Sequence, residues 1–219
     1  MGDRMRSKFD EEMALLHREL TQMGALCEEA IALTAQALDG DRGLADRVPA
    51  LEGEIDQMER DIEALCLKLL LRQQPVASDL RQVSAALKMI TDLERIGDQA
   101  NDIADIVSAI EAVGQGVVAR LRTMAQAAIH MVTASIDAYV CQDVDRAKKV
   151  INFDDTIDNA FQEIKIALVE HIAKNPELGE YALDQLMIAK YFERIGDHAA
   201  NVAEWVIFAV TGVHKGEKL

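Results

Sequence analysis

The chain has 219 residues, enough for one large domain or two small ones; half of them are hydrophobic but only 4% are aromatic. The abundance of Ala, Leu, Ile, Glu and Asp, with only three prolines, is typical of long helices with aliphatic seams. With 38 acidic and 23 basic residues the net charge is −15, which disfavours nucleic acid or anionic lipid as a direct partner.

No stretch of the sequence approaches the roughly 18 apolar residues that a membrane-spanning helix needs. The first residues also lack the apolar centre of a signal peptide. Cys27, Cys66 and Cys141 show no C-x-x-C spacing and lie within helical patterns, so we interpret them as buried free thiols. These features predict a cytoplasmic protein without direct membrane insertion.

The first half of the chain is predicted to form three helices. The first covers residues 9–37, and a short segment over 42–48 leads into the second, whose apolar residues recur at helical spacing from Ile55 to Leu69. Pro75 breaks this second helix. Ser78 or Asp79 can cap the third helix, which we expect to end near Val113, before a glycine-containing turn.

The second half follows the same plan, with helices predicted over 117–141, 144–173 and 178–210 and a break at Asn175-Pro176. The predicted fold is therefore all-α, with six long helices in two tandem antiparallel three-helix bundles. We place the first repeat at 9–113, the second at 117–211 and a flexible C-terminal tail at 212–219.

The two halves are an internal repeat. Residues 93–100, LERIGDQA, return 99 positions later as FERIGDHA at 192–199. Residues 52–56, EGEID, return 102 positions later as DDTID at 154–158. Because the offset falls from 102 to 99, the segment between the two blocks is three residues shorter in the second repeat than in the first. The turns near Pro75 and Pro176 are where such length changes are tolerated best.

Acidic pairs four residues apart mark both repeats, and this spacing puts both members of a pair on one helix face. An antiparallel hairpin centred on Pro75 places two such pairs opposite each other, and so does one centred between Asn175 and Pro176. We name the resulting groups the first acidic cluster (Glu52, Asp56, Glu94 and Asp98) and the second acidic cluster (Asp154, Asp158, Glu193 and Asp197).

Four carboxylates at one level repel each other unless their charge is neutralised. Some can stay protonated, arginines such as Arg95 and Arg194 can pair with them, or cations can bridge them. Sets of oxygen ligands suit magnesium, calcium, manganese or iron, and zinc also accepts carboxylates. Asp102 and Asn201 follow on the same helices and would extend the ligand sets, and His198 stands beside Asp197. The sequence therefore predicts metal binding at both clusters.

Two kinds of metalloenzyme also place carboxylates on facing helices. Di-iron bundle proteins need Glu-x-x-His pairs, and none of the five histidines has Glu three residues before it. A phosphoester hydrolase with two bridged metals would need a nucleophile or proton carrier near the cluster, but no Ser, Cys or His recurs at both motifs. The hydrolase stays open as an alternative, as does a metal buffer or a structural bundle with solvated acidic faces.

The Glu-Arg-Ile-Gly-Asp motifs at 94–98 and 193–197, with His-Ala-Ala-Asn-Val-Ala-Glu after the second, resemble the twin motifs of the PhoU family. The resemblance covers nearly the whole chain in length, repeat and helix plan. It implies a regulator of phosphate homeostasis with no catalytic or cofactor-binding residues, and metal ions at the eight residues of the acidic clusters.

The resemblance also implies the protein's partners. These are the ATPase subunit of the phosphate ABC transporter and a sensor histidine kinase, and a homodimer is expected. The protein would negatively regulate phosphate uptake and hold off the phosphate-starvation response when phosphate is ample. The two sites can differ, because Gln99 and Asp102 in the first repeat correspond to His198 and Asn201 in the second.

Overall fold

The structure is a computed structural model that describes residues 2–72, 77–109 and 115–218. Its first half contains helix α1 (Gly2–Leu38), the 3-10 helix η1 (Arg42–Arg47), and helices α2 (Val48–Arg72) and α3 (Ala77–Ala109). The helices match the prediction except that α1 starts at Gly2, seven residues before the predicted start at residue 9. Pro75 and Val113, which we used as predicted helix ends, lie outside the described residues.

The second half contains α4 (Gln115–Cys141), α5 (Val144–Lys174), the 3-10 helix η2 (Pro176–Leu178) and α6 (Gly179–Thr211). Helix α5 starts where predicted because the Asp143 side chain caps it, accepting a hydrogen bond from the Arg146 backbone N–H at 2.9 Å. It ends at Lys174, and Pro176 opens η2, so the predicted break at Asn175-Pro176 is confirmed.

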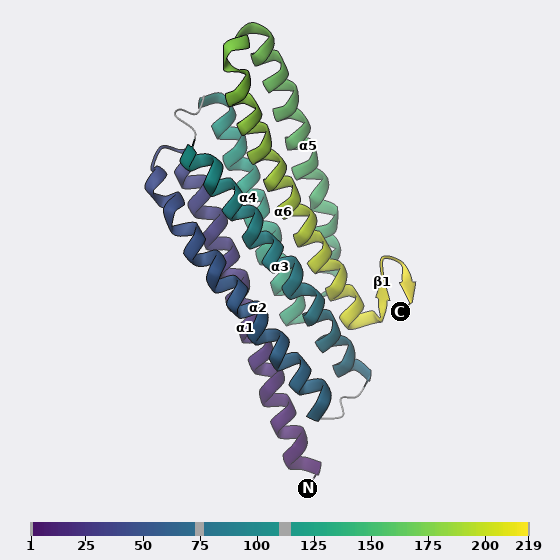
Figure 1. The fold of residues 1–219 in the computed structure, drawn as a ribbon. Coiled ribbons are helices and arrows are strands. Elements are labelled where there is room, and N and C mark those ends of the chain that lie inside the picture. The colour runs from purple at the N-terminus through teal and green to yellow at the C-terminus, as the bar shows by residue number, and fades with distance from the viewer. Residues whose placement is uncertain (1, 73–76, 110–114, 219) are drawn as a thin grey trace.

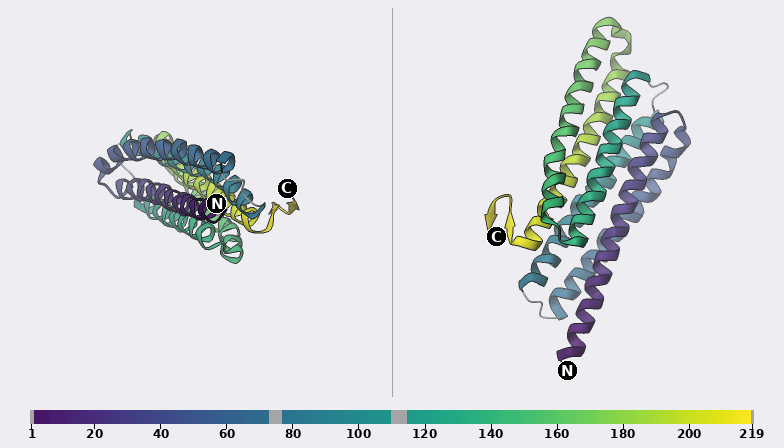
Figure 2. Two further views of the ribbon diagram at one scale, coloured as in Figure 1. Left: turned by 90° about the horizontal axis from the view of Figure 1, so that it is seen from below. Right: turned by 180° about the vertical axis from the view of Figure 1, so that it is seen from behind.

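The six long helices form two bundles that lie side by side (Figures 1 and 2). Helices α1, α2 and α3 pack on one another, as do α4, α5 and α6. The bundles are joined by α3 against α6 and by α1 against α4. The predicted all-α class with three helices per repeat is confirmed.

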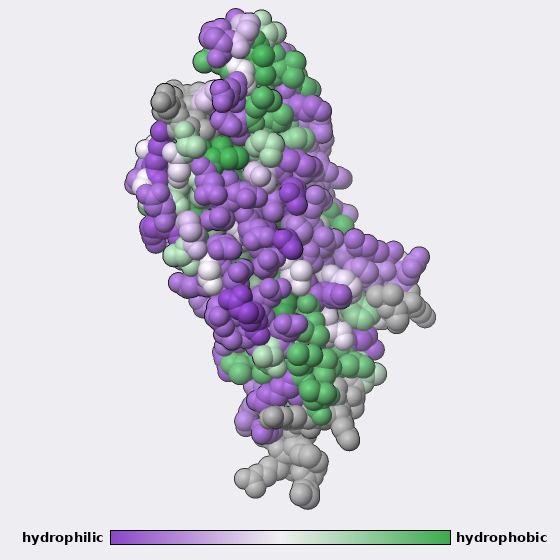
Figure 3. Space-filling view, viewed as in Figure 1, coloured by the Kyte–Doolittle hydropathy of each residue, from purple (hydrophilic) through white to green (hydrophobic). Residues whose placement is uncertain are grey.

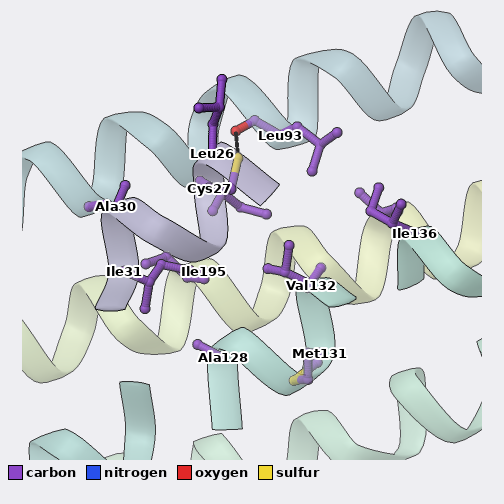
Figure 4. Packing of buried hydrophobic residues seen from close by; sticks show 14 of the residues in the cluster. Leu26, Cys27, Ala30, Ile31, Leu93, Ala128, Met131, Val132, Ile136 and Ile195 are labelled. Atoms are coloured by element: carbon purple, nitrogen blue, oxygen red, sulfur yellow. Dashed lines mark hydrogen bonds between the residues drawn. The ribbon is translucent and has the colours of Figure 1, made fainter. Parts of the chain in front are cut away.

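One hydrophobic core runs through both bundles. Figure 4 shows Cys27 and Ile31 of α1, Leu93 of α3, Val132 of α4 and Ile195 of α6 packed together, and all five are fully buried. The Cys27 Sγ donates a hydrogen bond of 3.3 Å to the Leu93 carbonyl. The two repeats are therefore units of sequence that share one interior.

The chain ends in a short β-hairpin rather than an unstructured tail. Gly212, in the left-handed conformation at φ 76°, ends α6, and strands β1 (Val213–His214) and β2 (Glu217–Lys218) pair antiparallel. The His214 ring stacks on the Trp205 ring of α6 with centroids 3.9 Å apart. We had expected a flexible tail over 212–219, and this stacking holds its first residues against α6.

Two further observations bear on the predicted class of protein. Across the described helices, no segment is both long and apolar enough to cross a membrane. The three cysteines are free, and Cys27 and Cys66 are buried as predicted. Cys141 is exposed, so our interpretation of it was wrong: it is the last residue of α4, where the helix leaves the core.

Candidate functional site: two acidic clusters

Helices α2 and α3 carry the first acidic cluster, and α5 and α6 carry the second. Each pair is antiparallel and in contact, so carboxylates from two helices meet at one level. A glycine makes each contact close: a Cβ on Gly97 would lie 3.0 Å from Ile55 Cδ1, and one on Gly196 would lie 3.0 Å from both Ile157 Cδ1 and Asp154 Oδ1. A Cβ at either position would press on these side chains, which favours glycine in mid-helix here despite its cost of about 1 kcal/mol relative to Ala.

The facing register of the first cluster appears in its electrostatics. Burial raises the pKa of Glu52, and the charges of Asp56 and of Asp98 on the facing helix raise it further. Burial likewise raises the pKa of Glu94, with repulsion from Asp98, Glu59 and Asp56 adding to the shift. The carboxylates that the hairpin register places opposite each other are thus within electrostatic reach.

Arg95 neutralises part of this first cluster. Its Nη1 donates to Asp98 Oδ2 at 2.9 Å, and its Nε lies 3.3 Å from Glu94 Oε2. The second contact is an ion pair without good hydrogen-bond alignment, so Glu94 Oε2 is buried without a hydrogen-bond partner. Pairing of an arginine with the carboxylates was one of the three predicted ways to offset their repulsion.

The second cluster is less well neutralised. Burial raises the pKa of Asp154 to about 6, and repulsion from Asp197, Asp158 and Glu193 contributes. Its Oδ1 is buried and has no hydrogen-bond partner. Burial and the neighbouring carboxylates also raise the pKa of Asp158 and of Asp197. This cluster therefore favours the binding of protons or cations.

The cation beside the second cluster is a lysine. Lys190 forms a short salt bridge with Glu193 and lies 5.4 Å from the centre of the Phe161 ring. Arg194, the other arginine that can pair with carboxylates, forms no ion pair with this cluster among the described residues, and its charge lowers the pKa of Asp102 and Tyr191 at the interface between the bundles. The two acidic clusters are thus paired with different basic residues, Arg95 in the first and Lys190 in the second.

The residues of each cluster fit a metal ion in chemistry but not in side-chain arrangement. All eight side chains of the clusters are carboxylates, which hard divalent ions and iron prefer, and Asp154 Oδ1 is a buried acceptor without a donor. Within the described part of the chain, however, no three His, Cys, Asp or Glu side chains lie together as a metal-holding group. Arg95 and Lys190 hold some of the carboxylates in ion pairs instead.

Asp102, Asn201 and His198 lie at the contact between α3 and α6. His198 Nδ1 lies 2.9 Å from Asp92 Oδ1, and Asn201 Nδ2 donates to the same oxygen at 3.4 Å. Asp102 accepts a hydrogen bond from the Tyr191 hydroxyl, and burial raises its pKa. These polar contacts link the two bundles beside the clusters.

Sequence reasoning missed four residues of this region. Glu59 adds its charge to the first cluster, and Lys190 pairs with Glu193. Each lies three residues from a cluster member on the same helix face, so the spacing could have identified both. Asp92 and Tyr191 had no such signal, because their partners His198 and Asp102 belong to the other repeat.

A surface cavity of about 410 Å³ opens beside the second cluster. Its polar lining combines both charges, with Asp154, Asp197, Glu204, Arg194 and Lys215 among the residues around it. Lys215 comes from the C-terminal hairpin, and its Nζ donates to Asn201 Oδ1 at 3.3 Å. Small ions therefore have access to the second cluster from solvent.

Comparison with known proteins assigns the family. A family model of the PhoU domain matches residues 20–107 and again 121–206. A phosphate-specific transport system accessory protein PhoU homolog from Pseudomonas aeruginosa is 36% identical over 94% of this chain and 86% of that protein. A protein of the same name from Clostridium acetobutylicum is 33% identical over 94% of this chain and 96% of its own length.

Solved structures agree with this assignment. The crystal structure of PhoU from Pseudomonas aeruginosa matches with a TM-score of 0.89 and 34% identity, covering 94% of this chain and all of that one. A PhoU structure from Streptococcus pneumoniae, at 24% identity and a TM-score of 0.85, shows the same fold. These relatives are named as accessory or regulatory proteins of phosphate transport, not as enzymes, so the metallohydrolase alternative is not retained. The chain belongs to the PhoU family.

Proposed function

We propose that this protein is a cytoplasmic negative regulator of phosphate uptake and of the phosphate-starvation response. It would contact the ATPase subunit of the phosphate ABC transporter and a sensor histidine kinase and couple the two. The observation that carries the proposal is the match of both halves of the chain to the PhoU domain, together with relatives named as accessory proteins of the phosphate-specific transport system. Three free thiols are consistent with a reducing compartment.

Gene deletion and complementation test the regulatory role. Deletion should switch on phosphate-starvation genes in phosphate-rich medium, and the wild-type gene should restore repression. Purified protein should bind the transporter ATPase subunit and the cytoplasmic part of the sensor kinase in separate pull-downs. Normal repression in the deletion strain would rule the role out.

The acidic clusters are proposed as metal sites of this regulator. Glu52, Asp56, Glu94 and Asp98 would hold ions in the first cluster, with Asp154, Asp158, Glu193 and Asp197 in the second. A bound Mg²⁺, Mn²⁺, Ca²⁺, Zn²⁺ or iron ion would supply positive charge where carboxylates repel each other. The raised pKa of Asp154 and its unpartnered Oδ1 support this proposal, since both reflect a carboxylate whose charge lacks a partner.

Elemental analysis of purified protein tests the metal proposal directly. The wild-type chain is compared with the double variants Glu94→Ala/Asp98→Ala and Asp154→Ala/Asp197→Ala. Asp155→Ala is a matched control, because Asp155 is an exposed acid beside the second cluster. Each double variant should lose the metal of its own cluster while the control keeps both. Equal metal content in all four proteins would exclude these residues as ligands.

The homodimer that the family resemblance implies is also a proposal. Sedimentation velocity over a range of protein concentrations tests it. A single species at the mass of one 24.2 kDa chain at every concentration would exclude it.

A further inference from the structure

The cavity of about 410 Å³ beside the second acidic cluster is lined by two basic side chains that have no carboxylate partner. These are Arg194 of α6 and Lys215 of the C-terminal hairpin. Among the described residues, Arg194 forms neither a salt bridge nor a hydrogen bond, and Lys215 donates only to Asn201 Oδ1 at 3.3 Å. Because both side chains carry several N–H donors, most of these donors are available to a ligand.

The first acidic cluster does not offer a free arginine at the equivalent place. Arg95, which corresponds to Arg194, forms ion pairs with two carboxylates of its own cluster. Asp102 stands where the second repeat has Asn201, so a further acid replaces the amide that holds the lysine. In the described part of the chain, the combination of carboxylates with unpaired basic residues is therefore a property of the second cluster.

The basic residues and the carboxylates of the cavity are close neighbours on α6. Arg194, Asp197 and Asn201 recur three and four residues apart, so they follow one another along one face of the helix. Lys215 is held at Asn201, and Asp154 of α5 borders the same cavity. Figure 3 shows mainly hydrophilic surface over the middle of α6 beside the C-terminal hairpin. The positions that supply the two positive charges thus lie on either side of Asp197 along the helix.

The carboxylates of the second cluster do not enclose a metal ion by themselves. Over residues 2–72, 77–109 and 115–218, no three His, Cys, Asp or Glu side chains lie together as a metal-holding group. A Mg²⁺ ion is commonly bound by one or two carboxylates, with waters and phosphate oxygens completing its coordination. A cation held by Asp154 and Asp197 would therefore keep open coordination positions in the cavity, and an anion can fill them.

The lining of the cavity favours a small oxyanion that arrives with a cation. Its acids Asp154, Asp197 and Glu204 outnumber its two bases, so the cavity would repel an anion unless a divalent cation were bound first. Ile151 and Ala200 are its apolar residues, and no Phe, Tyr or Trp is among the described residues of the lining. A nucleotide base would thus find no such ring to stack on, whereas phosphate oxygens accept charge-assisted hydrogen bonds from Arg and Lys.

We propose that this cavity binds inorganic phosphate together with a divalent cation. The carboxylates of the second acidic cluster hold the cation, and Arg194 and Lys215 donate hydrogen bonds to the phosphate oxygens. The inference rests on the proposed metal site of the second cluster. The first cluster, whose arginine is already paired, binds a cation without phosphate. Occupancy of the cavity rises with the phosphate concentration, which gives the regulator a direct input signal.

Equilibrium dialysis with radiolabelled inorganic phosphate measures this binding. The wild-type chain should bind phosphate in the presence of Mn²⁺, and the affinity should fall at least tenfold when EDTA replaces Mn²⁺. Arg194→Gln and Lys215→Gln should each weaken phosphate binding about tenfold, because each removes a charge-assisted hydrogen bond. Elemental analysis should show that both variants keep the manganese content of the wild-type chain, since neither residue binds the cation.

Three variants serve as controls. Arg47→Gln removes an exposed arginine of η1 that pairs with Glu29, and it should bind phosphate within twofold of wild type. The double variant Glu94→Ala/Asp98→Ala should keep phosphate binding, whereas Asp154→Ala/Asp197→Ala should lose it. Circular dichroism and thermal melts should show that every variant used in the comparison is folded.

The contrary outcomes separate this inference from the metal proposal. Manganese in the second cluster without phosphate binding would overturn the inference and leave the metal site intact. If elemental analysis finds no metal there, both proposals fail together. Unchanged phosphate affinity in Arg194→Gln and Lys215→Gln would exclude these residues as ligands, and equal binding in EDTA would exclude the bridging cation. Displacement of phosphate by an equal concentration of ADP would contradict the assignment to inorganic phosphate and indicate a nucleotide.

Discussion

Replacing Asp154 by Asn should make the protein more stable at neutral pH in the absence of metal. Asp154 is half-buried at the contact of α5 and α6, with its Oδ1 against Gly196 and without a hydrogen-bond donor. Asn has nearly the same shape and keeps an oxygen that can occupy this place. The substitution therefore removes the charge that burial and four neighbouring carboxylates disfavour, and it changes little else.

The size of the gain follows from the pKa of Asp154. Folding raises this pKa from 3.8 to about 6, and two pKa units correspond to at most about 3 kcal/mol. Because the side chain is only half-buried, solvent screening reduces the figure to about 1 kcal/mol. Well below pH 3.8 the carboxyl is protonated in both states. As the pH rises from about 4 through about 6 the folded state loses the excess proton bound by Asp154, so this side chain's contribution to stability is lost over that window in the wild-type chain and is absent from the Asn variant.

Thermal melts followed by circular dichroism, with EDTA present, measure this effect. At pH 7.5 the Asp154→Asn variant should melt about 2–4 °C above wild type, and at pH 3 the two should melt together. Asp155→Asn removes the charge of an exposed neighbour that contributes least to the raised pKa of Asp154, so it should raise the melting temperature by much less than Asp154→Asn. Added Mn²⁺ should favour the wild-type chain, since its four carboxylates are the proposed ligands. An Asn variant whose relative stability is the same at both pH values would refute this account of the cluster.

Three further changes test other parts of the structure. Arg95→Ala should lower the free energy of unfolding at pH 7.5 by about 1 kcal/mol in chemical denaturation, because its two ion pairs are partly exposed, and the loss should shrink in 1 M NaCl. Gly97→Ala should destabilise the protein by about 1–2 kcal/mol in the same assay, because its Cβ would press on Ile55. Adding Ile55→Val should remove most of that loss. A destabilisation that persists in the double variant would exclude this contact as its cause. A thiol reagent should label only Cys141 in the native protein and all three cysteines after unfolding. The reason is that Cys27 and Cys66 are buried, and burial raises the pKa of both thiols. Rapid labelling of all three thiols in the native protein would contradict the core packing.

Much of the fold and the location of both clusters could be predicted from the sequence, because both follow from local rules. Helical spacing puts Glu94 and Asp98 on one face, and an antiparallel hairpin brings Glu52 and Asp56 opposite them once its centre is known. The repeat then gives the same arrangement in the second half. This reasoning uses only the helices of one repeat and needs no information about the helices of the other bundle.

Contacts between the bundles could not be predicted in this way. The pair formed by Asp92 and His198 depends on how α3 lies against α6, which no spacing within a repeat encodes. The C-terminal hairpin likewise depends on the exposed face of Trp205, a tertiary surface that forms only when α6 is folded. The ion pairs within the clusters could not be predicted either, since Arg95 pairs with Glu94 and Asp98 in the first cluster, whereas Lys190 pairs with Glu193 in the second.

The contact between α3 and α6 joins equivalent helices of two repeats that lie on one chain. If each repeat were a separate polypeptide, the same contact would form only above its dissociation constant, and dilution would separate the halves. Covalent linkage instead holds the two halves at an effective concentration on the order of millimolar, whatever the amount of protein in the cell. A single chain also always contains one copy of each half, so the two halves are present in equal numbers. Sequence change can therefore give the two halves different counter-ions and different outer surfaces without any risk that like halves assemble together.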